Sequence, residues 1–304
     1  MTPGRRYIMP DIEALIRYIR ERRIEDGEGS GYSFVKELPP NIRDTFFAMS
    51  CLKMLKAASP DRRIVRFLSS YSHFDLNSAY YAMKCLKLAK STVCFQNGML
   101  SWRYKGDEQV KPCTIPTTPL TNYLKYNLYG MYGSSIFSSS MSTVLKRIEL
   151  GEPNLNRGLV NSVHAHLISN SRQDIMSTYM DLEILRAISM WGYATLLPPR
   201  TIRQIKDFLK SCTTHKGYVG SLTSNSVTLE STYAGHKIAK YLGIPGPLGI
   251  SFFIDSLQNE NGGFRRSPFC GISTLESCYL AMSVIFDSEE IESVQRREVE
   301  EYVL

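Results

Sequence analysis

The architecture follows from two neighbouring segments, Leu257-Gln-Asn-Glu-Asn-Gly-Gly-Phe264 and Thr274-Leu-Glu-Ser-Cys-Tyr279. The first closes an amphipathic run with a glycine-aromatic turn, and the second opens an apolar run that continues to Ile285. Glycine permits the backbone angles of a tight turn, and Ser or Thr at a helix start can accept hydrogen bonds from otherwise unpaired amides. The two segments therefore predict a helical hairpin over residues 250–286.

The same scheme recurs along the chain. Residues 202–243 contain Gly217-Tyr218 followed by Thr228-Leu-Glu-Ser-Thr-Tyr233, and the opening of the chain contains Gly31-Tyr-Ser-Phe34 followed by Ile42-Arg-Asp-Thr-Phe46. An aromatic residue anchors each second helix, at Phe46, Tyr80, Tyr123, Tyr179, Tyr233 and Tyr279. Such repetition predicts six helical hairpins, and we expect them to form one all-α domain over residues 1–304.

The two helices of a unit differ in polarity. The second helices are apolar over most of their surface, as in Ala79-Tyr-Tyr-Ala-Met-Lys-Cys-Leu86, whereas the first helices are more charged. This difference favours an inner layer of second helices wrapped by first helices. Periodicity alone allows either an open solenoid or a closed ring, and a ring would surround a pocket lined by aromatic residues and methionines. The polar segment Lys105–Pro112 is expected to be a loop.

The composition of the 304 residues, with 43% hydrophobic and 21% charged, excludes disorder, collagen and disulfide miniproteins. No apolar run approaches the length of about 18 residues that a transmembrane helix needs. The seven cysteines, mostly in apolar runs, indicate reduced thiols in a cytoplasmic protein. The net charge of +7 is spread along the chain, which favours a solvated surface or an anionic small ligand over nucleic acid.

The motif Gln-x-x-x-Gly-Gly-Phe, followed by a helix start with a small residue and Tyr, resembles the repeat of protein prenyltransferase β subunits and squalene/terpene cyclases. Residues 257–279 match it best, and the other units are weaker copies. The resemblance implies that the six hairpins close into an α/α toroid with a central cavity. It also implies an isoprenoid or prenyl diphosphate as ligand and, for a prenyltransferase, a helical partner subunit.

Carried over residue by residue, the prenyltransferase resemblance implies that Arg266 (or Arg265) and Tyr279 contact a diphosphate. It makes Glu276 and Cys278 candidate zinc ligands. A thiolate and a carboxylate can bind zinc, and zinc could activate a thiol substrate. Three positions differ from the family: Glu replaces Asp, the family's Lys between the Arg and the Asp is absent, and no His stands at the third ligand's place.

The cyclase resemblance implies a carboxylic acid that protonates an alkene. The chain lacks the Asp-x-Asp-Asp run that such cyclases use, so a single carboxylate would have to act. Asp44, Glu230 and Glu276 are the candidates. Glu230 and Glu276 occur in identical Leu-Glu-Ser contexts, where a carboxylate either faces the cavity or stabilises the helix start.

The anchor tyrosines Tyr80, Tyr179, Tyr233 and Tyr279 either line an isoprenoid pocket or pack in the core. We therefore expect an isoprenoid-handling protein, with prenyl transfer as the first reaction. Two alternatives stay open: a non-catalytic toroid that binds a lipid or a partner protein, and a cyclase that uses one carboxylate. The position of Glu230 and Glu276, in a shared cavity or at helix termini, discriminates between these functions.

Overall fold

The fold is a mostly helical assembly with short strands, seen in a computed structural model of the chain. The structure describes residues 10–27, 29–58, 61–71, 75–96, 99–103, 111–114, 174–189, 197–269 and 271–288. The anchor expected at Tyr123 lies outside these residues. Among the described residues, none of the helices is both long and apolar enough to span a bilayer.

Each described helix can be assigned to one of the two roles that the repeat predicts. The first helices of the units are α1 (Ile12–Arg20), α3 (Arg62–Ser69), α9 (Pro199–Cys212) and α11 (Ile250–Asp255). The second helices are α2 (Ile42–Met54), α4 (Leu76–Leu88), α8 (Ile175–Ser189), α10 (Leu229–Leu242) and a helix over 275–288.

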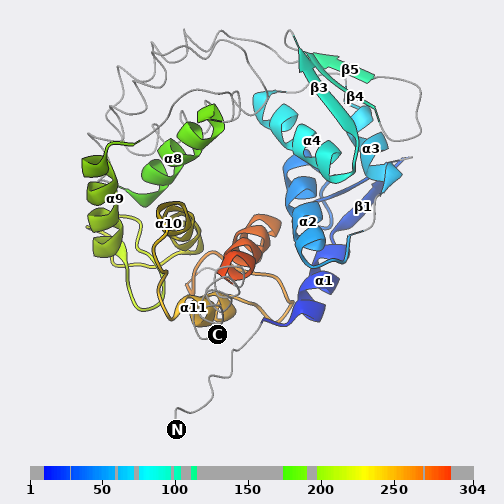
Figure 1. The fold of residues 1–304 in the computed structure, drawn as a ribbon. Helices are drawn as coiled ribbons and strands as arrows, with labels where there is room; N and C mark the ends of the chain where they lie inside the picture. Colours follow the sequence, from blue (N-terminus) through cyan, green and yellow to red (C-terminus); the bar gives the residue numbers. More distant parts are fainter. Residues whose placement is uncertain are drawn as a thin grey trace, which may run out of the picture.

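The second helices lie side by side along an arc in the order α8, α10, 275–288, α2 and α4, with the first helices on the outer side (Figure 1). Tyr279 contacts Phe46 and Phe47 of α2, and Asp287 contacts Lys237 of α10. The last unit of the chain is therefore packed directly against the first. Glu276 and Arg43, each the second residue of its helix, form an ion pair, so these two helices run parallel.

Each second helix begins with a side-chain cap placed five residues before its aromatic anchor. The cap side chain accepts a hydrogen bond from the backbone N–H three residues later, which satisfies one of the free amides of the first turn. The caps are Asn41, Asp75, Asp174, Thr228 and Thr274. Side-chain capping at these helix starts is confirmed, although Asn or Asp takes the place of Ser or Thr in three units.

In three units, the aromatic residue of the glycine-aromatic turn is hydrogen-bonded to the second helix. The buried aromatic's backbone N–H donates to the side chain four residues after the cap. The pairs are Tyr32 with Thr45 Oγ1 at 2.9 Å, Tyr218 with Thr232 Oγ1 at 3.5 Å and Phe264 with Cys278 Sγ at 3.4 Å. Cys278 therefore occupies the same structural place as two threonines.

The Gln-x-x-x-Gly-Gly-Phe motif joins the last unit to the first. The Gln258 side chain accepts a hydrogen bond from the N–H of Asp11 at 2.8 Å and donates one to its carbonyl at 2.9 Å. Gly262 has a φ of +83° and lies against the backbone of Ala14. Only glycine combines that φ with so close a backbone contact at no cost.

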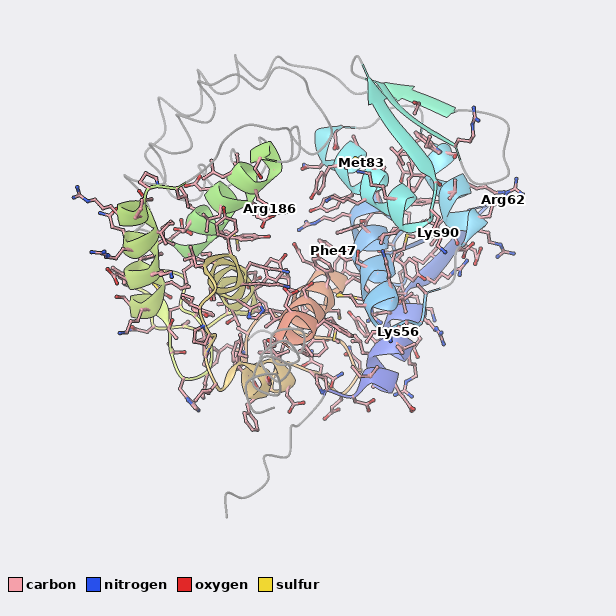
Figure 2. All side chains as sticks on the ribbon, in the orientation of Figure 1. Phe47, Lys56, Arg62, Met83, Lys90 and Arg186 are labelled. Carbon is pink, nitrogen blue, oxygen red and sulfur yellow. The ribbon has the colours of Figure 1, made fainter. Side chains whose placement is uncertain are left out.

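Two of the second helices, α2 and α4, are followed by a lysine in the left-handed conformation that glycine usually adopts after a helix. Lys56 and Lys90, one residue beyond the helix caps of α2 and α4, have φ values of 54° and 60° (Figure 2). Gly243 has a φ of 63° at the end of α10. A left-handed residue lets the next amide bond a carbonyl of the last turn, as Ser91 does with Leu86 at 2.9 Å.

The all-α expectation is wrong within residues 23–114, where short strands occur. Strands β1 (Arg23–Asp26) and β2 (Gly29–Tyr32) form an antiparallel pair, and β3 (Thr92–Gln96), β4 (Met99–Arg103) and β5 (Lys111–Thr114) form an antiparallel sheet. The apolar run Thr92-Val-Cys-Phe suits a strand because β-branched and aromatic residues pack well on a pleated surface. Lys111 and Pro112, expected in a loop, belong to β5.

Candidate functional site

Aromatic side chains of the second helices form two groups of touching rings, which together we call the aromatic arc. It consists of Phe46, Phe47, Tyr80, Tyr81, Tyr179, Tyr233 and Tyr279. Apart from the buried Phe47, these side chains are half-buried and pack against the core from one side. Figure 2 shows Phe47 on α2, the helix that contacts 275–288 through this ring. The repeat thus places an aromatic residue at the same height on five helices.

Ring contacts join α8 to α10 and, in a second group, join the helix over 275–288 to α2 and α4. The hydroxyl oxygens of Tyr179 and Tyr233 are 3.3 Å apart, and their ring centroids are 5.6 Å apart. The centroids of Tyr279 and Phe46 are also 5.6 Å apart. Phe46 reaches Tyr81 at 5.4 Å, and Tyr81 reaches Tyr80 at 5.2 Å. These separations are the ones at which aromatic side chains attract each other.

The phenols of Tyr179, Tyr233 and Tyr279 stay neutral at pH 7. Burial raises the pKa of Tyr179 and of Tyr233 above the usual value for tyrosine. Burial also raises the pKa of Tyr279, opposed by hydrogen bonds with Ser283 and Tyr233. The arc therefore offers uncharged aromatic faces joined by hydrogen-bonded hydroxyls, which suit an apolar ligand or a delocalised cation.

Cations border the arc. The Lys84 ammonium is 5.1 Å from the Tyr80 ring centroid, and the Lys237 ammonium is 5.3 Å from that of Tyr233. On the side of the helix starts, the Arg43 guanidinium is 5.6 Å from the ring centroid of Phe47. Two of these cations are also paired with carboxylates, Arg43 with Glu276 and Lys237 with Asp287.

Glu276 forms an ion pair with Arg43. Arg43 donates two hydrogen bonds to its carboxylate, at 2.6 and 2.7 Å. The Glu276 side chain is 43% exposed. The structure therefore places this candidate catalytic residue and zinc ligand in a partly exposed ion pair between the last unit and the first.

Glu230, its counterpart in the preceding unit, also pairs with an arginine. The Arg266 Nε atom is 2.8 Å from Glu230 Oε1, and the Arg266 side chain is 64% exposed. Glu230 Oε2 is buried and makes no hydrogen bond. Arg266, a candidate diphosphate ligand, and Glu230, a candidate acid, are thus brought together. Arg265 instead donates to the backbone carbonyl of Ser256 at 3.0 Å.

Asp44, the third candidate acid, holds a turn. Its carboxylate accepts hydrogen bonds from the N–H of Phe34 at 3.0 Å and from the Asn41 side chain at 2.7 Å. Asn41 is the cap of α2, so Asp44 connects the helix start to the preceding loop. The contacts found for Asp44 belong to that local structure.

Cys278 is fully buried, and its sulfur accepts the hydrogen bond from Phe264 described above. Burial raises the pKa of its thiol to about 12. Glu276, two residues earlier, is instead held by Arg43 on the exposed side. As placed, this thiol and carboxylate do not fit as two ligands of one zinc ion, and zinc binding stays an untested prediction. Within the described residues no three His, Cys, Asp or Glu side chains gather as a metal site.

Two groups of residues were missed at the sequence level. Arg43 follows its cap by two residues, as Glu230 and Glu276 follow theirs, so superimposing the repeats would have marked it as a partner position. Lys237, Lys240 and Asp287 form a charged cluster beside the arc. That cluster has no sequence motif, because Asp287 comes from a different unit.

The chain was compared with known proteins: no protein-family model matches it, and no curated protein gives a significant match. The aromatic arc and the repeat are therefore the features of the chain that indicate a function.

Proposed function

We propose that the chain closes as an α/α toroid of six helical hairpins and binds an isoprenoid, in particular a prenyl diphosphate, against the aromatic arc. The observation that carries the proposal is that aromatic rings contact each other between neighbouring second helices, Tyr179 with Tyr233 and Phe46 with both Tyr279 and Tyr81. The resemblance of residues 257–279 to the prenyltransferase and cyclase repeat supports the same ligand class.

The chemistry of the arc suits such a ligand. An isoprenoid chain is an apolar strip of methyl groups and double bonds, and it gains stability by leaving water for an aromatic surface. Aromatic faces also attract the positive charge that develops when a diphosphate leaves an allylic carbon. Tyr179, Tyr233, Tyr279 and Tyr80 would then contact the ligand rather than serve only as core.

Specific contacts favour the non-catalytic alternative, a toroid that binds an isoprenoid or other lipid without reaction. Glu276, Glu230 and Asp44 are each engaged with an arginine or a helix start, and the Cys278 thiol is buried and protonated. A prenyl transfer would need Glu276 to leave Arg43 and Cys278 to lose its proton. A cyclase would need one of the three carboxylates to become a neutral acid.

The prenyltransferase function also implies a partner subunit. Large apolar side chains are exposed in the loops that precede α10 and the helix over 275–288, at Leu222, Phe269 and Ile272. Phe269 is 93% exposed, so a partner that covered it would gain free energy by removing its apolar surface from water. A chain that is active as a stable monomer would contradict a required partner.

A thermal-shift assay with farnesyl diphosphate and farnesol tests the ligand class. A ligand at about 100 times its Kd stabilises the folded state by about 2.7 kcal/mol, which is a shift of several degrees. We expect both compounds to stabilise the wild type, with Tyr233→Leu losing most of the shift. Tyr241→Leu, an exposed tyrosine on the same helix, is the matched control. No shift with either compound would overturn the proposal.

Zinc content separates the enzymatic version from the binding version. Near-stoichiometric zinc in the wild type that is lost in Cys278→Ala would establish the transferase. Stabilisation by farnesyl diphosphate without zinc would favour a carrier or a metal-independent cyclase, and product analysis would distinguish these two.

A further inference from the structure

Three equivalent loops each connect a glycine-aromatic turn to the start of a second helix. The loops are residues 33–41, 219–228 and 265–274. They precede α2, α10 and the helix over 275–288, which lie side by side (Figure 1). The N–H of Leu229 donates to the carbonyl of Arg266 at 2.9 Å, and Arg43 forms its ion pair with Glu276. These contacts join the three helix starts, so the loops lie together at one end of the second helices.

Most of the exposed apolar side chains belong to these three loops. In the part of the chain that the structure describes, nine large apolar or aromatic side chains are exposed, and five of them lie here. We call these five the loop tips: Phe34, Leu38, Leu222, Phe269 and Ile272. Exposed apolar side chains that gather at one end of a molecule indicate a surface that contacts a protein or a membrane.

The charge around the loop tips is positive. The three loops contain Lys36, Arg265 and Arg266, but their sequences include a single acidic residue, Glu37. Lys36 is exposed, and the Arg266 side chain is 64% exposed although its Nε atom pairs with Glu230. The three helices also point their amino ends, which carry partial positive charge, toward this end of the molecule. The loop tips therefore stand on a surface that favours anionic groups.

The spacing of the loop tips favours a fluid partner over a folded one. Leu222 is flanked by Ser221 and Thr223, and the other loop tips come from two separate loops. A protein interface of ordinary size takes about 800 Å² from each partner and has a continuous apolar core, which separate side chains do not supply. The surface of a bilayer is fluid, so each apolar side chain can insert by itself while Lys36 and Arg266 stay among the phosphates.

We infer that the loop tips insert into the surface of a membrane that contains anionic lipids. This inference rests on the proposed function for its purpose, because an isoprenoid leaves water for a bilayer and a protein that binds it would meet it there. The anchors Phe46, Tyr233 and Tyr279 follow the helix caps by five residues, which is less than two helical turns. The end of the molecule that carries the loop tips is thus the end from which a ligand would reach the aromatic arc.

The test is flotation of the whole chain with vesicles of phosphatidylcholine, prepared with and without phosphatidylserine. We expect binding, and stronger binding when phosphatidylserine is present. Phe269→Ser should weaken it by about 10-fold because it removes the most exposed ring, and Leu222→Ser should weaken it less. Lys36→Gln should weaken binding to the phosphatidylserine vesicles by about fivefold.

Leu248→Ser is the matched control for Leu222→Ser. Both leucines are exposed, but Leu222 precedes the amino end of α10 and Leu248 follows its carboxyl end. Leu248→Ser should therefore bind vesicles as the wild type does. Because all of these side chains are exposed, the melting temperatures of the variants should match that of the wild type, which excludes a general loss of folding.

The outcomes separate the inference from the proposed function. If the wild type binds neither kind of vesicle, the inference is wrong, and stabilisation by farnesyl diphosphate would still support the proposed function. If the chain binds vesicles through Phe269 but neither farnesyl diphosphate nor farnesol stabilises it, the membrane surface stands and the isoprenoid function fails. Equal losses in Leu222→Ser and Leu248→Ser would overturn the assignment to the loop tips. A chain that ignores vesicles but needs Phe269 to bind a partner subunit would make these loops a protein interface instead.

Discussion

The chain contains the same four residues, Thr-Leu-Glu-Ser, at the start of α10 and at the start of the helix over 275–288. Both copies cap their helix with the threonine side chain, and both pair their glutamate with an arginine from the adjacent unit. Beyond the first turn both copies keep the anchor tyrosine, Tyr233 or Tyr279, but most of the other residues differ. The later copy joins the ends of the chain through Arg43, while the earlier one carries a buried histidine and the charged cluster. The identical local sequence therefore determines how each helix starts, whereas the neighbouring units determine which contacts its residues make.

A substitution in the turn that precedes the later copy should have the largest effect on the free energy of unfolding. Gly262 has a left-handed φ and a Cβ there would overlap the backbone of Ala14, which cannot move aside as a flexible side chain can. We expect Gly262→Ala to lower the free energy of unfolding by about 3 kcal/mol or more. Gly220→Ala, in the corresponding loop of the earlier copy, meets open space and should change it by less than about 1 kcal/mol. Urea unfolding measures both variants, and equal losses would contradict the tight docking of α1.

His236, which is buried in the earlier copy, should make the free energy of unfolding depend on pH. Burial lowers the pKa of His236 from 6.5 to about 4, with Lys237 and Lys240 acting in the same direction and Asp287 opposing. The unfolded chain therefore takes up a proton below pH 6.5 that the folded chain refuses, so stability falls as the pH drops from 6.5 to about 4. The loss attributable to this residue is about 3 kcal/mol.

Met282 occupies the place of His236 in the later copy, eight residues after the cap. His236→Met should therefore remove this part of the pH dependence while leaving the stability at pH 7 nearly unchanged. Unfolding by urea at a series of pH values checks it. If the variant keeps the wild-type slope between pH 6.5 and 4, the buried histidine is not the source.

Cys278 and Thr232 perform the same task in the two copies, as acceptors for the turn amide. Cys278→Ala should cost about 1–3 kcal/mol because it leaves a buried N–H unpaired. Cys278→Thr copies the earlier unit and should cost less than about 1 kcal/mol. The melting temperatures of the two variants measure their stabilities. The zinc content of each purified variant tests separately whether the thiol binds metal. Loss of bound zinc in a stable Cys278→Thr variant would show that the thiol is a ligand after all.

The two glutamates should give the smallest effects. Both ion pairs are partly exposed, so Glu276→Gln and Glu230→Gln should each cost less than about 1 kcal/mol, with the doubly hydrogen-bonded Glu276 the larger. A double-mutant cycle with Arg43→Gln measures the coupling directly. A loss of ligand binding in either variant, with no change in stability, would instead indicate that this glutamate contacts the ligand.

The repeat could be recognised from sequence because its signals are short-range. A cap acts on an amide three residues away, and the aromatic anchor follows five residues after the cap, so both lie within two helical turns. The strands were missed because Thr92–Arg103 has no repeat of its own, and apolar runs of this length read equally well as helix or strand. The anchor aromatics of the arc were predicted from the sequence, although the ring contacts of Phe47 and Tyr81 were not.

By itself, the sequence determined which residues start helices, where glycine-aromatic turns close the hairpins and which aromatic side chains share one height on the second helices. Those features depend on bonds and periodicities within a few residues. Only the tertiary structure decided that Glu276 meets Arg43, 233 residues away, and that Cys278 serves a turn amide. It also decided that Lys237 and Lys240 share Asp287. Such contacts depend on which units become neighbours, and therefore on how the whole set of helices buries its apolar surface.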